Sequence, residues 1–334
     1  MTNTARALPP MVDIHTHIEG AAHPAFVRAQ AAKYNVDLSQ IFADDGETYA
    51  WHDFTSFIAA YGAVSDVLRA PEDYIALTED VLMRQAADGV IYQEFFCSHD
   101  NSDRMGCSVT DMWDAMAEGA ARAKAATDIE CRFITTGVRN IGMHHIDEAA
   151  KLAEKHPHPM VTGFGMAGDE RMGRVAEVAN AFERAQHAGL RLTAHAGELC
   201  GPQSVRDCLD HLKVERIGHG VRAVEDMDLV KRLAHEGIVL EVCPGSNIAL
   251  NVFEPETHPL RTLHEAGVAV TVAADDPPFF ATTTRAEYEM AWGRFGFSLN
   301  ELTELSKVAI AAAFVDDTTR AKLFAKLEDT QTHK

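Results

Sequence analysis

The chain has 334 residues, 46% of them hydrophobic and 24% charged, which is the composition of an ordinary globular protein with one large or two smaller domains. Asp and Glu number 50 against 30 for Lys and Arg, so the formal net charge is −20, and because an acidic surface repels phosphate backbones we expect no nucleic-acid partner. No apolar run approaches the ~20 residues that a membrane-spanning helix needs, so we expect no membrane segment.

The cysteines and the first ten residues predict a cytoplasmic protein. The six cysteines form no Cys-x-x-Cys pair and are too sparse for a disulfide framework, so we expect reduced thiols. Residues 1–10 lack the apolar core of a signal peptide.

The first part of the chain predicts one strand followed by helices. Residues 11–17 alternate apolar and polar side chains, as a strand does. A helix is expected at 24–34, an aromatic-rich helix at about 49–61, and a third helix at 71–87, which opens with Pro-Glu-Asp.

From residue 90 on, strand-like and helix-like segments alternate. Further strands are expected at 90–96, 131–136, 160–164, 190–194, 216–218, 238–242 and 268–272. Helices are expected at 109–126, 146–155, 170–188, 204–211, 224–235, 259–265, 286–294, 299–314 and 318–327. Alternating strands and helices form parallel sheets, and eight such units fit a closed barrel better than an open sheet. The sequence therefore predicts an α/β fold, a (β/α)8 TIM barrel with extra C-terminal helices, as a single domain over residues 1–334.

The long connection after the first strand, about residues 21–88, is predicted to be a helical insertion. Insertions of this kind lie over the C-terminal mouth of a barrel and often form lids. Phe54, Phe57 and Tyr61 recur at helical spacing within it. Such a stripe belongs either to the core or to a ligand pocket, and both interpretations stay open.

The first strand ends in His15-x-His17, a pattern that fits a metal site. Alternation along a strand puts both side chains on one face, here the barrel interior. Two imidazoles on one inward face suit a divalent transition metal. The alternative is a pair of polar core residues, but two buried histidines without partners are unfavourable.

Three further strand ends carry polar residues where a barrel of this kind places its active site. The fifth strand ends in His195, with Glu198 one turn on, the sixth in His219 between two glycines, and the eighth in Asp275 and Asp276. Adjacent carboxylates repel each other, so a nearby cation is the favoured reason for the last pair.

These residues form a candidate metal-dependent hydrolytic site. The candidate ligands are His15, His17, His195 and one of the two aspartates, and such a set leaves net positive charge on zinc, which acidifies a bound water. Glu198 is then free to carry a proton to the substrate, and His219 to orient or deprotonate the water.

Residues 163–168 spell Gly-x-Gly-x-x-Gly, a motif of dinucleotide-binding sites. In such sites the pyrophosphate lies at the start of the following helix. Here Asp169 and Glu170 occupy that position and would repel it. We therefore expect a glycine loop whose backbone N–H groups meet a planar ligand.

Taken together, these motifs resemble the adenosine/adenine deaminase family of the amidohydrolase superfamily. The resemblance covers about residues 11–315, and as a set the motifs are highly specific. They are His15-x-His17-x-Glu19-Gly20, Ala167-Gly168-Asp169-Glu170, His195-Ala196-Gly197-Glu198, Gly218-His219-Gly220, Cys243-Pro244-x-Ser246-Asn247 and Asp275-Asp276-Pro277.

The resemblance implies a role for each candidate residue. It implies one Zn²⁺ per chain, held by His15, His17, His195 and Asp275. It implies that Glu198 protonates the purine N1, that His219 handles the attacking hydroxide, that Asp276 hydrogen-bonds N7 and that the backbone N–H of Gly168 meets N3. Hydroxide adds to C6, and the tetrahedral carbon then loses ammonia.

The substrate implied by the resemblance is a small purine nucleoside or base. Glu19 stands where adenosine deaminases usually have Asp, as in the adenine branch, and its longer side chain would shrink the space for ribose. The turn Asp-Asp-Pro-Pro-Phe-Phe also favours adenine, whereas the Ala-Gly-Asp-Glu sequence has the adenosine form. We favour adenosine and 2′-deoxyadenosine, with adenine or an N6-substituted purine as the alternative.

Two other functions remain as alternatives. A binuclear amidohydrolase would need a bridging Lys or Glu at the end of the fourth strand, where this chain has Gly-Phe-Gly-Met. A non-catalytic purine-binding barrel would have no need of Glu198 and Asp276 beside intact metal ligands. The oligomeric state is left open.

Overall fold

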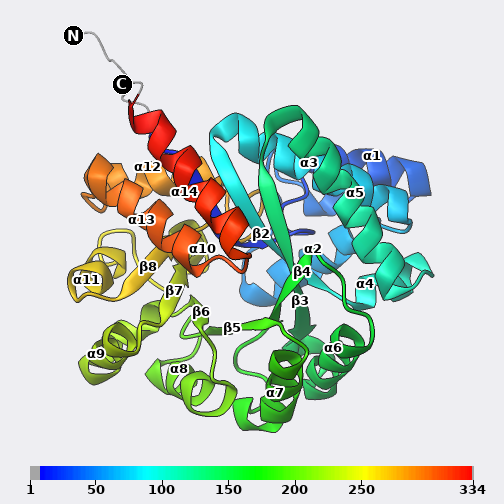
Figure 1. Ribbon diagram of the computed structural model, residues 1–334. Coiled ribbons are helices and arrows are strands. Elements are labelled where there is room, and N and C mark those ends of the chain that lie inside the picture. The colour runs from blue at the N-terminus through cyan, green and yellow to red at the C-terminus, as the bar shows by residue number, and fades with distance from the viewer. Residues whose placement is uncertain (1–7, 333–334) are drawn as a thin grey trace.

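The computed structural model describes residues 8–332 and confirms the TIM-barrel prediction. Eight strands pair in parallel, each with the next in chain order. Figure 1 shows the strands at the centre and the helices around them. The strands are β1 (Met11–His17), β2 (Val90–Ser98), β3 (Glu130–Val138), β4 (Val161–Ala167), β5 (Arg191–Ala196), β6 (Arg216–His219), β7 (Val239–Val242) and β8 (Ala269–Val272), and each overlaps a predicted strand.

The barrel closes between the first and last strands at one short seam. Thr16 and Asp275 form a parallel bridge. The backbone N–H of His17 donates to the Asp275 carbonyl at 3.0 Å, and the N–H of Asp275 donates to the His15 carbonyl at 3.1 Å. The register of β1 on β2 shifts between Asp13 and Thr16. A bulge of this kind re-aims the side chains that follow it.

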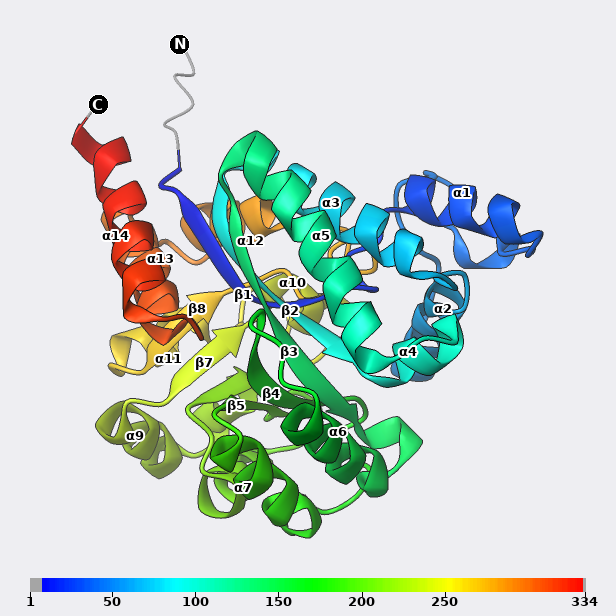
Figure 2. The same cartoon turned by 45° about the vertical axis from the view of Figure 1, so that its right-hand side comes forward.

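Fourteen α-helices are found among residues 8–332, and α1 and α2 project from one side of the barrel (Figure 2). They are α1 (Pro24–Tyr34), α2 (Phe54–Ser65), α3 (Pro71–Asp88), α4 (Asp100–Met105), α5 (Val109–Thr127), α6 (Met143–Lys155), α7 (Ala179–His187), α8 (Pro202–Asp207), α9 (Met227–Glu236), α10 (Pro244–Ala249), α11 (Leu260–Glu265), α12 (Thr284–Gly293), α13 (Leu299–Ala312) and α14 (Asp317–Thr332). None of these helices is both long and apolar enough to cross a membrane.

Two helices begin well after their predicted first residue. The helix expected from about residue 49 begins at Phe54, because Asp53 and Ser56 form a capping box there. The helix expected from residue 170 is replaced at first by loop and a 3₁₀ turn over Val175–Val178, and α7 follows.

The connection between β1 and β2 contains α1, a 3₁₀ turn (Ser39–Ile41), α2 and α3. The division into one domain over residues 1–334 includes ends that lie outside the described residues, and it stays a prediction.

The barrel interior is packed beneath the mouth by large apolar side chains. Phe96 lies against His15 with ring centroids 4.6 Å apart, and it forms a buried cluster with Ile134 and Phe314. Gly163 leaves room for that cluster, since a Cβ there would lie 2.6 Å from the Phe314 ring. The segment after α13 therefore enters the lower end of the barrel.

Candidate active site

The four predicted metal ligands meet at the ends of β1 and β5 and just after β8. One ligand atom from each of His15, His17, His195 and Asp275 lies within 4.8 Å of the others. Nε2 of His195 is 3.0 Å from that of His15 and 3.1 Å from that of His17. Asp275 Oδ1 is 3.3 Å from Nε2 of His17 and 3.6 Å from that of His15. A tetrahedral metal with bonds of 2.0–2.1 Å would hold its ligand atoms about 3.3 Å apart, so these spacings fit such an ion.

The histidine tautomers also fit a cation. His15 Nδ1 lies 2.6 Å from a carboxylate oxygen of Glu241, and His195 Nδ1 lies 3.0 Å from the Met166 carbonyl. Both Nδ1 atoms therefore carry the proton, and the two Nε2 lone pairs face each other at 3.0 Å. A cation between them removes that repulsion. Burial and the neighbouring imidazoles hold the pKa of His195 well below its usual value, which keeps this ring neutral and able to coordinate.

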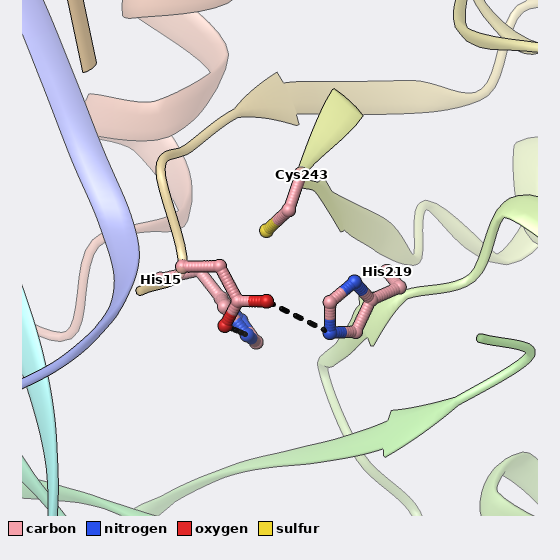
Figure 3. Close-up of side chains that lie close together, drawn as sticks. His15, His219 and Cys243 are labelled. Atoms are coloured by element: carbon pink, nitrogen blue, oxygen red, sulfur yellow. Dashed lines mark ion pairs between the residues drawn. The ribbon is translucent and has the colours of Figure 1, made fainter. Parts of the chain in front are cut away.

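A second group of side chains borders the same space. Figure 3 shows His15, His219 and Cys243 pointing toward one another, and with Asp275 they offer ligand atoms within 4.8 Å. Burial raises the pKa of the Cys243 thiol well above its usual value, and its Sγ–H donates to the Glu241 carbonyl at 3.5 Å. A protonated thiol is a poor metal ligand, so the group around His195 is the better metal site.

Glu198 stands in a turn that is held by another carboxylate. Gly197 has φ of +69°, and a Cβ there would lie 2.6 Å from a methyl group of Val205. The Glu170 side chain accepts the four consecutive backbone N–H groups of residues 197–200, at 2.5–3.1 Å. Burial, with the charges of Asp275 and Glu170, raises the pKa of Glu198 well above its usual value, so Glu198 can hold a proton for delivery.

His219 is oriented by a chain of hydrogen bonds from the seventh unit. The Leu260 N–H donates to Nδ1 of His258 at 3.3 Å, which leaves the His258 proton on Nε2 to face Asn247 Oδ1 at 3.3 Å. The Asn247 amide then donates to His219 Nδ1 at 3.3 Å. A neutral His219 therefore presents Nε2–H to the cavity, 3.8 Å from both Glu198 and Asp275.

Two site residues have backbone φ angles in the left-handed region, which non-glycine residues rarely adopt. His219 has φ of +62° and Asp275 has φ of +61°. Non-glycine residues in this region are strained, and such strain concentrates at functional sites. Gly218 is also required, since a Cβ there would lie 2.7 Å from the His15 ring.

Glu19 is buried and its carboxylate is already occupied by protein donors. Oε1 accepts from Tyr74 at 2.9 Å and from Asn101 at 2.7 Å, and the Cys97 thiol lies at 3.5 Å. Oε2 accepts from Tyr61 at 2.7 Å. This one side chain thus ties α2, α3 and the β2–α4 region to the end of β1.

Asp276 and Gly168 line the same cavity. Asp276 is buried, and its Oδ1 has no hydrogen-bond partner. Gly20 is needed beside it, since a Cβ there would overlap Oδ1 at 1.6 Å. Burial and the charge of Asp275 raise the pKa of Asp276 well above its usual value, so it can donate to a ring nitrogen.

The cavity between these residues has a volume of about 220 Å³. Phe54, Phe57 and Tyr61 all line it, and they also belong to the hydrophobic core or pack against it, so both predicted interpretations hold. Two larger hollows, of 530 and 730 Å³, contain none of the ligands, so chemistry and not size identifies the site.

The cavity offers no free cation to a phosphate group. Of the Lys and Arg residues in the described chain, Arg104 alone lines it. Its guanidinium lies 3.2 Å from Asp100 and 3.6 Å from Asp66, and it donates to Asn101 at 2.9 Å. Asp100 and Asp66 therefore neutralise the positive charge of Arg104, which the phosphate group of a nucleotide would need.

The structure adds positioning residues that the sequence interpretation missed. Glu170 belonged to a recognised motif, but its only assigned role was to repel pyrophosphate, yet it holds the turn that carries Glu198. Glu241 was considered only as part of a strand, yet it fixes His15. The available signal was a lone carboxylate inside the otherwise apolar run 238–242. Asn247 belonged to a recognised motif but had no assigned role.

Comparisons with known proteins agree with this geometry. The family model described as adenosine deaminase matches residues 10–330. The chain is 51% identical over 317 residues to an adenine deaminase of Rhizobium rhizogenes, covering 95% of this chain and 98% of that protein.

Two solved structures are also similar. An adenine deaminase from Arthrobacter aurescens has a TM-score of 0.89 and 29% identity, covering 97% of this chain and 99% of that one. A zinc-bound amidohydrolase from Burkholderia ambifaria shares the fold, with a TM-score of 0.86, 24% identity and coverage of 99% and 98%.

Proposed function

The chain belongs to the adenosine deaminase family of hydrolytic deaminases, and we propose that its substrate is free adenine, which it converts to hypoxanthine and ammonia. The sequence interpretation preferred adenosine and kept adenine as the alternative. The adenine deaminases that are 51% and 29% identical to this chain favour the alternative.

The hydrogen-bonded carboxylate of Glu19 is the observation that carries the proposal. Tyr74 and Asn101 donate to Oε1 and Tyr61 donates to Oε2, so one acceptor position on Oε2 is left for a sugar hydroxyl. A ribose placed here would bury more hydroxyl groups than this one position can accept from, which is unfavourable. A free base carries no such groups.

A zinc ion held by His15, His17, His195 and Asp275 would supply an acidified water. Glu198, kept protonated by its surroundings, gives its proton to N1 of the base and makes C6 electrophilic. Asp276 donates to N7, and the Gly168 backbone, with φ of +93°, brings its N–H to N3. These contacts fix the ring plane in the cavity.

The reaction balances without another reactant. The water oxygen bonds to C6, and the bond from C6 to the exocyclic nitrogen breaks. One water proton leaves with that nitrogen as ammonia, the other returns to Glu198, and the proton that Glu198 donated stays on N1 of hypoxanthine. His219 presents Nε2–H toward the attacking oxygen and stabilises charge that develops there. In this arrangement His219 is a hydrogen-bond donor, which corresponds to the orienting role among the two that the sequence predicted.

The test compares kcat/KM for adenine, adenosine, 2′-deoxyadenosine, an N6-methylated adenine and AMP, followed by absorbance. We expect adenine to be preferred by about 100-fold, the discrimination that a pocket without partners for an added hydroxyl reaches. Equal or faster turnover of adenosine would overturn the substrate proposal. Metal analysis should find one zinc per chain, and two would favour the binuclear alternative.

A further inference from the structure

A buried ion-pair network connects the lower end of the barrel to the metal ligand His15. Arg216, the first residue of β6, is 1% exposed. Its Nη2 donates to Glu94 at 2.7 Å, and its Nε lies 2.5 Å from Oε1 of Glu241. The other Glu241 oxygen lies 2.6 Å from His15 Nδ1. One guanidinium therefore bridges two fully buried carboxylates, and one of these touches a metal ligand.

The position of Arg216 is set by the segment that follows α13. Its Nη1 donates to the Ala312 carbonyl at 3.2 Å, and its guanidinium lies 3.5 Å from the centre of the Phe314 ring. The Phe314 N–H donates to Glu94 Oε1 at 2.6 Å, so the same segment also fixes the second carboxylate. The Ala312 carbonyl, the Phe314 ring and the two carboxylates together fix the position of the guanidinium.

We propose that Arg216 is a positioning residue that sets the affinity of the metal site by holding Glu241 against His15. Two buried carboxylates without a cation would repel each other and move apart. Glu241 would then leave Nδ1 of His15, and that ring would lose the tautomer and orientation that aim Nε2 at the metal. The proposal rests on the proposed metal site but not on the identity of the purine.

Arg191 provides a matched control at the same end of the barrel. It also lies over Phe314, at 4.7 Å, and donates to the Ala313 carbonyl at 3.0 Å. Its carboxylate partner is Glu215, at 2.5 Å, and no contact joins it to Glu241 or His15. A change at Arg191 therefore disturbs the same packing without disturbing the network.

The test measures zinc affinity by competition with a chromophoric chelator on the full-length holoenzyme. In Arg216→Lys the ammonium keeps the charge but cannot reach both carboxylates and the Ala312 carbonyl together. We expect zinc to bind 10- to 100-fold more weakly, the usual effect of losing an outer partner of a metal ligand. A double variant, Arg216→Met with Glu94→Gln, removes one positive and one negative charge and should show the same loss. Arg191→Met should bind zinc as the wild type does.

Two further readouts separate positioning from a general structural role. The absorption spectrum of the cobalt-substituted protein should change in the Arg216 variants and not in Arg191→Met. A purely structural role would lower the unfolding temperature of the metal-free protein and leave zinc affinity and the cobalt spectrum unchanged, and this result would overturn the proposal. A wild-type protein that binds no zinc would instead refute the proposed metal site.

Discussion

Replacing Glu170 by glutamine should disable the enzyme without touching its metal ligands. The Glu170 carboxylate accepts four backbone N–H groups of residues 197–200, the turn that carries Glu198. The change keeps the shape of the side chain but turns one oxygen into an NH₂ group. If the remaining oxygen keeps its three bonds to residues 198–200, the N–H of Gly197 faces another donor.

The expected loss of stability follows from the number of hydrogen bonds that weaken or break. An unsatisfied buried N–H group costs about 1–3 kcal/mol, and each bond to a charged acceptor exceeds one to a neutral acceptor by about 1 kcal/mol. Because the buried charge disappears as well, we expect a net loss of about 3 kcal/mol in the free energy of unfolding. A shift of Glu198 by about 1 Å lowers turnover by about 100-fold.

The assay combines kcat/KM for adenine, the thermal unfolding midpoint and the zinc content of Glu170→Gln. Zinc should stay at one per chain while activity falls. The matched control is Glu177→Gln, which changes an exposed carboxylate paired with Arg174 in the same connection, and it should behave as the wild type. Activity of Glu170→Gln within threefold of the wild type would refute the role of this carboxylate.

Three further predictions concern single side chains. Glu198→Gln should keep zinc and lose at least about 100-fold in kcat, whereas unchanged turnover would remove the proton-donor assignment. Glu19→Asp should pull the carboxylate away from Tyr61 and Asn101, lower kcat/KM for adenine by about 10-fold and raise the ratio of adenosine to adenine turnover; a constant ratio would contradict the specificity argument. Burial lowers the pKa of His258 to about 4. Between pH ~6.5 and 4 the unfolded chain therefore binds a proton that the folded chain does not. The free energy of unfolding falls as the pH falls, by up to about 1.4 kcal/mol per pH unit. Urea unfolding of wild type and His258→Gln at pH 5 and 7.5 should show a smaller pH effect in the variant, and equal effects would exclude His258 as the source.

The barrel could be predicted from the sequence because its strands are buried apolar runs with turn-forming residues at their ends. Helices α4 and α10 were missed because each has six residues, too few for a clear helical period, and each shares its connection between two strands with another helix that was predicted. The prediction of a helix from residue 170 was wrong for another reason. Glu170, which suits a first helical turn, is directed instead to the N–H groups of another loop, and this tertiary contact overrides the local preference.

The candidate metal ligands were accessible to sequence reasoning because strand ends in a barrel converge on one mouth. The residues that hold them were not, since Glu241 meets His15 across 226 positions and no local pattern encodes that contact. The surroundings of Glu19 were hidden for the same reason, because its donors come from three separate segments. The sequence interpretation took Glu19 as a sign of adenine but also weighed the adenosine form of the Ala-Gly-Asp-Glu sequence, and it favoured adenosine.

The seam of the barrel has a consequence for synthesis on the ribosome. His15 and His17 leave the ribosome early, but Asp275 joins them only when β8 has been made and has paired with β1. Pairing two strands that lie so far apart in the sequence is slow, because the chain loses conformational entropy before the contacts between the strands form. The complete ligand set is thus a property of the finished chain. A nascent or truncated chain ending before residue 269 can hold three imidazoles but cannot complete the proposed site, so we expect activity only after translation has passed the eighth strand.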